Sequence, residues 1–208
     1  GEKVCLLSNG VPILDENKEL VGYRGVHKDI TDRKQKESQI LWQQRVQEGV
    51  NRILMEGIQM DSDQGLAELC LKVAMLITSS SQGAIVEFDE GRNPVTMAGD
   101  LQNHSLKILE QVKDTRKSAS ELQQNKKVCL AVPLIHADEM FGAIVICRYQ
   151  EKYDFQTRRT VEILAPAFMG ALIRNRSSRE VELARKSAEE INQRLKDAVK
   201  REKQLALQ

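Results

Sequence analysis

The sequence predicts an α+β protein: a central antiparallel sheet flanked by helices, a separate amino-terminal β-hairpin, and long helices at both ends. Three observations indicate this architecture. Two pairs of β-rich runs, within 84–99 and 127–149, are each joined by a short turn. The stretch 46–77 repeats apolar residues every three or four positions, as one-sided helices do. The stretch 177–205 carries a heptad repeat.

The amino-terminal residues 3–31 contain two strand candidates on either side of the turn-forming Asp15-Glu16-Asn17. A lone two-stranded hairpin is marginal in water. We therefore expect this hairpin to belong to a larger sheet, or to pack through its open edges on a neighbouring chain or its symmetry mate.

Two helices are predicted next. The first starts at Thr31 or Asp32, either of which can cap it, and it is mostly polar up to Gln44, so this half bridges domains or pairs with a partner. The second begins at 61–64 and ends at 79–83. Its expected buried stripe is Leu66, Leu69, Cys70, Val73, Ala74 and Ile77.

The predicted sheet follows. Strands at 84–88 and 94–99 form a hairpin around Asp89-Glu90-Gly91. Residues 100–126 are mixed, with a short helical patch at 106–112. The near-continuous apolar runs 127–135 and 140–149 are expected at the centre of the sheet, where both faces are covered. A long final helix begins near Asp154, a suitable N-cap.

Beyond Ser177 the apolar spacing alternates between four and three residues for about four heptads. The repeat is weak because alanines and Glu202 occupy several of its core positions. We expect a parallel homodimer through this helix and the polar helix before Val46. The expected dimer residues are Val181, Ala184, Ala188, Ile191, Leu195, Ala198 and Leu205.

The composition excludes several classes of partner. The net charge of +1, from 31 basic and 30 acidic residues, argues against nucleic acid. No apolar run approaches the roughly 20 residues that span a bilayer, and no signal peptide is visible. We therefore expect a cytoplasmic protein without direct membrane insertion. The cysteines lack CxxC spacing and are expected to be buried, reduced thiols: Cys5, Cys70, Cys129 and Cys147.

The stretch GVPILDENKELVGYRGVHKDITDRKQKE, residues 10–37, resembles the carboxy-terminal end of a PAS domain. The resemblance rests on its last strands, on residues 22–25, on the Asp-Ile-Thr triplet at 29–31 and on the basic pair that follows. It implies a signal-relay role at the hairpin–helix junction. A salt-bridge relay among Arg24, Asp29 and Arg33 is one interpretation, and solvated charges beside a helix cap are the other. The implied relay residues are Arg24, Asp29, Ile30, Thr31 and Arg33.

The stretch CLAVPLIHADEMFGAIVICR, residues 129–148, resembles the central strands of a GAF domain, and EILAPAFMGALIRNR, residues 162–176, resembles its last helix. The implied organisation is a PAS-derived hairpin at 1–31, a linker helix at 32–45, a GAF domain at 46–176 and a coiled-coil signalling helix at 177–208. This order resembles the sensor part of bacterial signalling proteins that feed a histidine kinase or a diguanylate cyclase. The resemblance therefore implies a regulatory fragment of a signal-transduction protein, such as a two-component system, and not an enzyme.

The GAF resemblance also implies a ligand pocket, lined by Ile85, Glu87, Met97, His104, Leu106 and Cys129. No cysteine lies beside a histidine, as bilin attachment requires, and Asn125-Lys126 lacks the Phe and Asp-Glu that accompany it in cyclic-nucleotide binders. We expect neither cofactor. Haem would have only His104 as an axial ligand. A small apolar or mixed ligand remains open, as does the alternative of a dimerisation scaffold that binds no ligand.

No histidine pair has metal-ligand spacing, and no nucleophile lies beside a base, so we expect no metal site and no catalytic residue. Cys129 and Cys147 lie on adjacent predicted strands. A shift of one residue in strand register would turn one of them to the other face. The sequence alone therefore leaves open whether they meet, and structural thiols are favoured over a redox switch.

Overall fold

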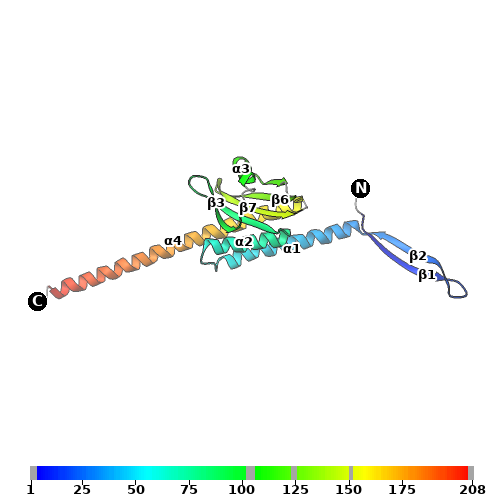
Figure 1. Ribbon diagram of the computed structural model, residues 1–208. Helices are drawn as coiled ribbons and strands as arrows, with labels where there is room; N and C mark the ends of the chain where they lie inside the picture. The colour runs from blue at the N-terminus through cyan, green and yellow to red at the C-terminus, as the bar shows by residue number, and fades with distance from the viewer. Residues whose placement is uncertain (1–3, 102–105, 123–125, 150–151, 206–208) are drawn as a thin grey trace. The chain divides into compact units, whose positions relative to one another are not determined.

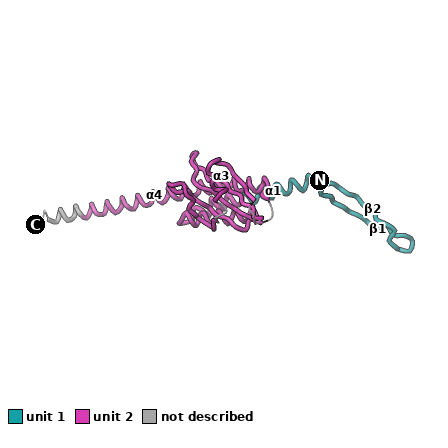
Figure 2. Tube along the Cα trace, turned by 45° about the horizontal axis from the view of Figure 1, so that its top comes forward, with its two compact units in different colours: residues 1–47 teal, residues 48–208 magenta. Residues whose placement is uncertain are grey.

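The computed structural model describes residues 4–101, 106–122, 126–149 and 152–205, with side chains in the last helix described as far as Asp197. The chain forms two compact units, Gly1–Gln47 and Glu48–Gln208 (Figure 2). The elements are β1 (Leu6–Leu14), β2 (Leu20–Asp29), α1 (Thr31–Gly57), α2 (Asp63–Thr78), β3 (Gln82–Phe88), β4 (Pro94–Gly99), α3 (Leu106–Thr115), β5 (Ala119–Leu122), β6 (Lys127–His136), β7 (Glu139–Tyr149) and α4 (Phe155–Leu205) (Figure 1).

The first unit contains the predicted hairpin, β1 and β2, which pair antiparallel as a two-stranded sheet. The turn is held by the Asp15 carboxylate, whose Oδ1 accepts the backbone N–H groups of Asn17 at 2.9 Å and Glu19 at 2.8 Å. Apolar side chains such as Val11 and Val26 are exposed in the single chain. The expectation that another chain or further strands cover them stays a prediction.

The second unit is built on a five-stranded antiparallel sheet with strand order β4-β3-β7-β6-β5. The two apolar runs predicted at the centre are β6 and β7, and most of their residues are buried. The edge strand β5 was not predicted. It has four residues and pairs with β6 alone, so it carries too little pattern to be recognised.

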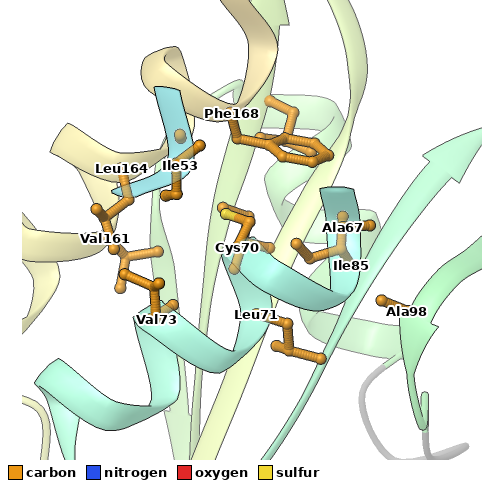
Figure 3. Packing of buried hydrophobic residues seen from close by; sticks show 14 of the residues in the cluster. Ile53, Ala67, Cys70, Leu71, Val73, Ile85, Ala98, Val161, Leu164 and Phe168 are labelled. Carbon is orange, nitrogen blue, oxygen red and sulfur yellow. The ribbon is translucent and has the colours of Figure 1, made fainter. Parts of the chain in front are cut away.

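Helices cover both faces of this sheet (Figure 1). Val50 and Ile53 of α1 pack with α2, α4 and one face of the sheet in the larger core, and Figure 3 shows Ile53 among them. The shorter α3 covers the other face with Ile108, Leu109 and Val112, which are buried among side chains of β3, β5, β6 and β7. The fold class predicted from the sequence, a central antiparallel sheet flanked by helices, is confirmed.

Helix ends follow the local sequence. Ser62 caps α2 by accepting the N–H of Gly65, and Ser79 ends it in the left-handed conformation with φ 52°. Asp154 caps α4 as predicted, because its Oδ1 accepts the N–H of Thr157 at 2.7 Å. Its hydrogen bonds to the Thr157 side chain and backbone hold the pKa of this carboxyl below its ordinary value, against a smaller desolvation effect.

The helix α4 has 51 residues and continues beyond the sheet. The expected dimer residues Val181, Ala184, Ala188, Ile191 and Leu195 are exposed in the single chain, whereas the side chains of Ala198 and Leu205 lie outside the described residues. Such exposure is required for a dimer interface but does not test it. Within the described ranges, no helix combines the length and the apolar character needed to cross a membrane.

Candidate functional site

Four charged side chains meet where α4 leaves the sheet, and we call Asp63, Glu87, Arg176 and Arg179 the exit cluster. Arg176 donates through Nε to Asp63 Oδ2 at 2.5 Å and through its two terminal nitrogens to Glu87 at 3.1 and 3.0 Å. Arg179 donates to the other oxygen of Asp63 and, at 3.2 Å, to the carbonyl of Asp61. One carboxylate therefore bridges two arginines.

The positions of these residues explain why they meet. Arg176 and Arg179 are three residues apart and share a face of α4. Asp63 is the first residue of α2, where a negative charge also interacts favourably with the helix dipole. Glu87 lies near the end of β3, and the Arg176 guanidinium stands 5.1 Å from the ring centre of Phe141 on β7. A single arginine thus contacts α2, β3 and β7.

The cluster is partly shielded from water. The exposed fractions of the side chains are 35% for Arg176, 24% for Asp63 and 30% for Glu87. The pKa of Arg176 is raised, first by its hydrogen bonds to Glu87 and then by Asp63, and desolvation opposes this. A bidentate arginine–carboxylate pair fixes geometry as well as charge. The arrangement is suited to holding α4 in one orientation.

The end of α1 is attached to the same part of α4. The Asn175 amide donates to the Gly57 carbonyl at 2.6 Å, and Arg174 donates to the Leu54 carbonyl at 3.1 Å. The last carbonyls of a helix lack intrahelical donors, so side chains from a neighbouring helix can satisfy them. Asn175 is among the few buried polar residues. The helix that enters this unit and the helix that leaves it are therefore linked directly.

The residues predicted to line a ligand pocket are divided among several parts of the second unit, and their ligand-binding role stays a prediction. Ile85 is buried in the larger core and Met97 packs against it, whereas Cys129 is buried in the α3 core. Leu106 is 41% exposed, and Glu87 belongs to the exit cluster. His104 lies outside the described residues.

Strand register explains why Ile85 and Cys129 lie in different cores. Cys129 pairs with Cys147, which pairs with Gln82, so these three residues form one row across the sheet. Ile85 is three positions from Gln82 on β3, and side chains alternate between the faces of a strand. Ile85 and Cys129 therefore face opposite sides of the sheet.

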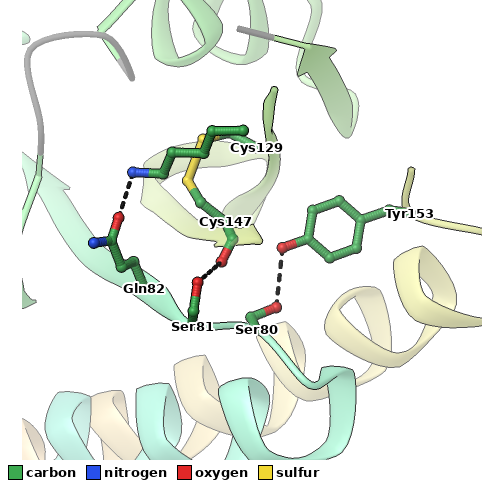
Figure 4. The surroundings of a disulfide bond; sticks show 7 residues. Ser80, Ser81, Gln82, Cys129, Cys147 and Tyr153 are labelled. Carbon is green, nitrogen blue, oxygen red and sulfur yellow. Dashed lines mark hydrogen bonds between the residues drawn. A yellow bond between two sulfur atoms is a disulfide. The ribbon is translucent and has the colours of Figure 1, made fainter. Parts of the chain in front are cut away.

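The prediction of reduced, buried cysteines is partly wrong. Cys129 and Cys147 are buried but joined by a disulfide, because the register places them directly opposite each other (Figure 4). Cys5 is an exposed free thiol. Only Cys70 fits the expectation: it is free and buried, and desolvation raises its pKa.

In the part of the first unit that the structure describes, no salt bridge joins Arg24, Asp29 and Arg33, so the salt-bridge relay is not formed. The Asp29 carboxylate accepts the N–H and hydroxyl of Thr31, whose Oγ1 accepts the N–H of Cys5. The Thr31 side-chain bond is the main cause of the lowered pKa of Asp29. Arg33 pairs instead with Glu37, one helical turn away. The alternative interpretation, a helix cap with solvated charges, describes this junction.

Ile30 holds the same junction through its backbone. Its N–H donates to the Cys5 carbonyl at 2.9 Å, and its own carbonyl accepts the N–H of Lys34 at 2.9 Å. Arg24 lies opposite Val11 within the hairpin. The predicted relay residues are therefore divided between the strand and the start of α1.

No family model and no curated protein matches the chain. Among solved structures, the GAF domain of a putative sensor histidine kinase from Pseudomonas syringae pv. tomato superposes with a TM-score of 0.56 at 19% identity, covering 74% of this chain and 99% of that one. The fold is that of a GAF domain.

Other GAF structures support the same fold. A GAF domain from a phosphoenolpyruvate-protein phosphotransferase of Coxiella burnetii gives a TM-score of 0.55 at 12% identity, covering 65% of this chain and 96% of that one. The corresponding Acinetobacter domain gives a TM-score of 0.53 at 13% identity, covering 62% of this chain and 93% of that one.

Among the described residues, no group of three or more His, Cys, Asp or Glu could hold a metal ion.

Proposed function

We propose that this chain is a cytoplasmic regulatory module in which a GAF domain, preceded by the end of a PAS domain, relays a signal through a dimeric α4 to an output domain. A histidine kinase is the first candidate for that output, and a diguanylate cyclase is the second. In this proposal the chain catalyses nothing itself. One observation carries the proposal: within six residues of α4, 174–179, polar side chains bond to α1, to α2 and to the sheet.

The geometry suits transmission by helix movement. A shift of β3 would move Glu87, and a shift of α1 would move the Gly57 carbonyl, so both act on neighbouring residues of α4. A ligand can shift α4 between two arrangements only if it binds one of them more tightly than the other. The similarity to a GAF domain of a putative sensor histidine kinase is consistent with this role.

The alternative is a dimerisation scaffold whose GAF domain binds no ligand. The face beneath α3 favours it, since Val86, Ile108, Leu109 and Val112 fill that layer with apolar side chains. Mass spectrometry of small molecules released when the purified protein is denatured separates the two. A stoichiometric ligand supports a ligand-sensing module, and its absence supports the scaffold.

The relay itself is tested by fusing residues 1–208 to a histidine kinase core and inserting one to seven residues after Asp197. The kinase activity of the fusion should vary with the number of inserted residues and return to its original level with an insert of seven residues, because coiled-coil geometry repeats every seven residues. Activity that ignores the insertion length would contradict transmission through helix geometry.

A further inference from the structure

The proposed relay through the exit cluster does not involve the Cys129–Cys147 disulfide. The two residues are directly paired on β6 and β7, with Cα atoms 4.2 Å apart, as in pairs that exchange no backbone hydrogen bonds. Both side chains lie on the face that α3 covers, in one core with Ile108, Leu109 and Val112. The disulfide is therefore part of the surface on which α3 packs.

The surroundings of the pair are polar at one end (Figure 4). Lys127 precedes Cys129 by two positions, so both side chains point to the same face of β6. Its ammonium donates to Gln82 Oε1 at 2.5 Å, and Gln82 is the β3 partner of Cys147. Lys127 is 2% exposed, and desolvation lowers its pKa while Asp100 opposes this.

The free thiol of Cys5 bears on the redox environment of the protein. Cys5 is exposed and unpaired, which fits a reducing environment better than an oxidising one. Disulfides that form in the cytosol are usually transient and redox-sensing or catalytic. This step rests on the cytoplasmic location in the proposed function.

We propose that Cys129 and Cys147 form a reversible thiol–disulfide site that exchanges with a low-molecular-weight thiol such as glutathione, and that its redox state sets how α3 packs on the sheet. Because both cysteines are buried, the exchange requires local opening of α3. In the reduction, a glutathione thiolate attacks one sulfur and forms a mixed disulfide, and the other cysteine leaves as a thiolate that takes up a proton. A second glutathione attacks the mixed disulfide, releasing the second cysteine and oxidised glutathione. Two electrons pass from two glutathione molecules to the protein.

Reduction changes the volume that the pair requires. Two sulfurs bonded at about 2.05 Å must separate by roughly 1.5 Å to reach non-bonded contact. Protein interiors are close-packed, so a neighbouring element must yield. The ten-residue α3 is the element that yields, since so short a helix depends on its packing.

The carboxy-terminal end of α3 is held to neighbouring turns. Lys113 donates to the Arg92 carbonyl at 2.9 Å, and Arg116 donates to the Asp138 carbonyl at 3.0 Å. The amino-terminal end has only an exposed ion pair among the described residues, Lys107 with Glu121 at 3.5 Å, which contributes little. The change is therefore expected mainly between Leu106 and Val112.

The test equilibrates the folded wild-type chain in buffers of reduced and oxidised glutathione, then alkylates it in denaturant and counts free thiols by mass. Two thiols are expected in the oxidised protein, Cys5 and Cys70, and four after reduction. Hydrogen exchange of α3 is measured in the same samples. We expect reduction within the glutathione range and exchange of α3 amides faster by about tenfold or more.

Two variants serve as controls. Cys70→Ala keeps the pair and should retain the response, whereas Cys129→Ala/Cys147→Ala should show α3 exchange that is independent of glutathione. A disulfide that stays intact in reduced glutathione until the chain unfolds would overturn the proposal, since structural disulfides behave in this way. Reduction with unchanged α3 exchange would overturn it equally. Neither result depends on the kinase fusion, so this site and the relay can fail separately.

Discussion

Replacing Arg176 by Gln should lower the free energy of unfolding of the second unit by about 2 kcal/mol. The change removes a bidentate pair with Glu87 and a bond to Asp63. Hydrogen bonds to charged groups contribute about 1.5–3 kcal/mol, and surface ion pairs about 0–1 kcal/mol. Because these side chains are 24–35% exposed, we place the loss in the lower half of the first range.

A double-mutant cycle isolates the pair. Glu87→Gln alone should lower the free energy of unfolding by about 1 kcal/mol. The loss in the double variant should be about 1 kcal/mol smaller than the sum of the two single losses, and this difference is the coupling energy of the pair. The assay is urea unfolding followed by circular dichroism, since the single tryptophan, Trp42, lies in the other unit. Arg185→Gln is the matched control: this arginine is 64% exposed and pairs only along α4, so its loss should stay under about 0.5 kcal/mol. A coupling energy near zero, or an equal loss in the control, would refute the reasoning.

Three further predictions concern other parts of the molecule. Asp154→Ala should cost about 1 kcal/mol at neutral pH. Because the folded-state pKa of Asp154 is lowered, its contribution to stability is complete above its unfolded pKa, about 4, and is lost as pH falls through the folded pKa. The unfolding free energies of the wild type and Asp154→Ala, measured against pH, should therefore converge in acid. Gly142→Ala places a Cβ 1.9 Å from the Val86 carbonyl oxygen and should cost more than about 2 kcal/mol in urea unfolding, whereas Gly170→Ala meets nothing within 4 Å and should stabilise the helix by up to about 1 kcal/mol. Light scattering should give about twice 23.5 kDa, and a monomer at high concentration would contradict the dimer.

The elements that the sequence predicted are those with a strong local period. Val73 and its neighbours in α2, and the apolar runs of β6 and β7, repeat with the spacing that their structures require. The PAS and GAF resemblances supplied the expected order of domains. The four residues of β5 have no such repeat, and the sequence did not reveal them.

The site was less predictable because its partners are distant in the chain. Arg176 lies 113 residues from Asp63 and 89 from Glu87, so no local pattern connects them. A run of charged and amide residues directly after the apolar stripe of α4, at 174–176, was the available signal. The disulfide and the predicted pocket depended on strand register, which hydrophobic pattern alone does not fix when both faces of a strand are buried.

Hydrogen exchange across residues 172–180 of α4 tests the central claim most directly, namely that the exit cluster holds α4 on the sheet and α2 of the second unit. In Arg176→Gln, these amides should exchange about tenfold faster or more than in the wild type, while Arg185→Gln leaves them unchanged. Equal protection in all three proteins, or equal acceleration in both variants, would contradict the claim.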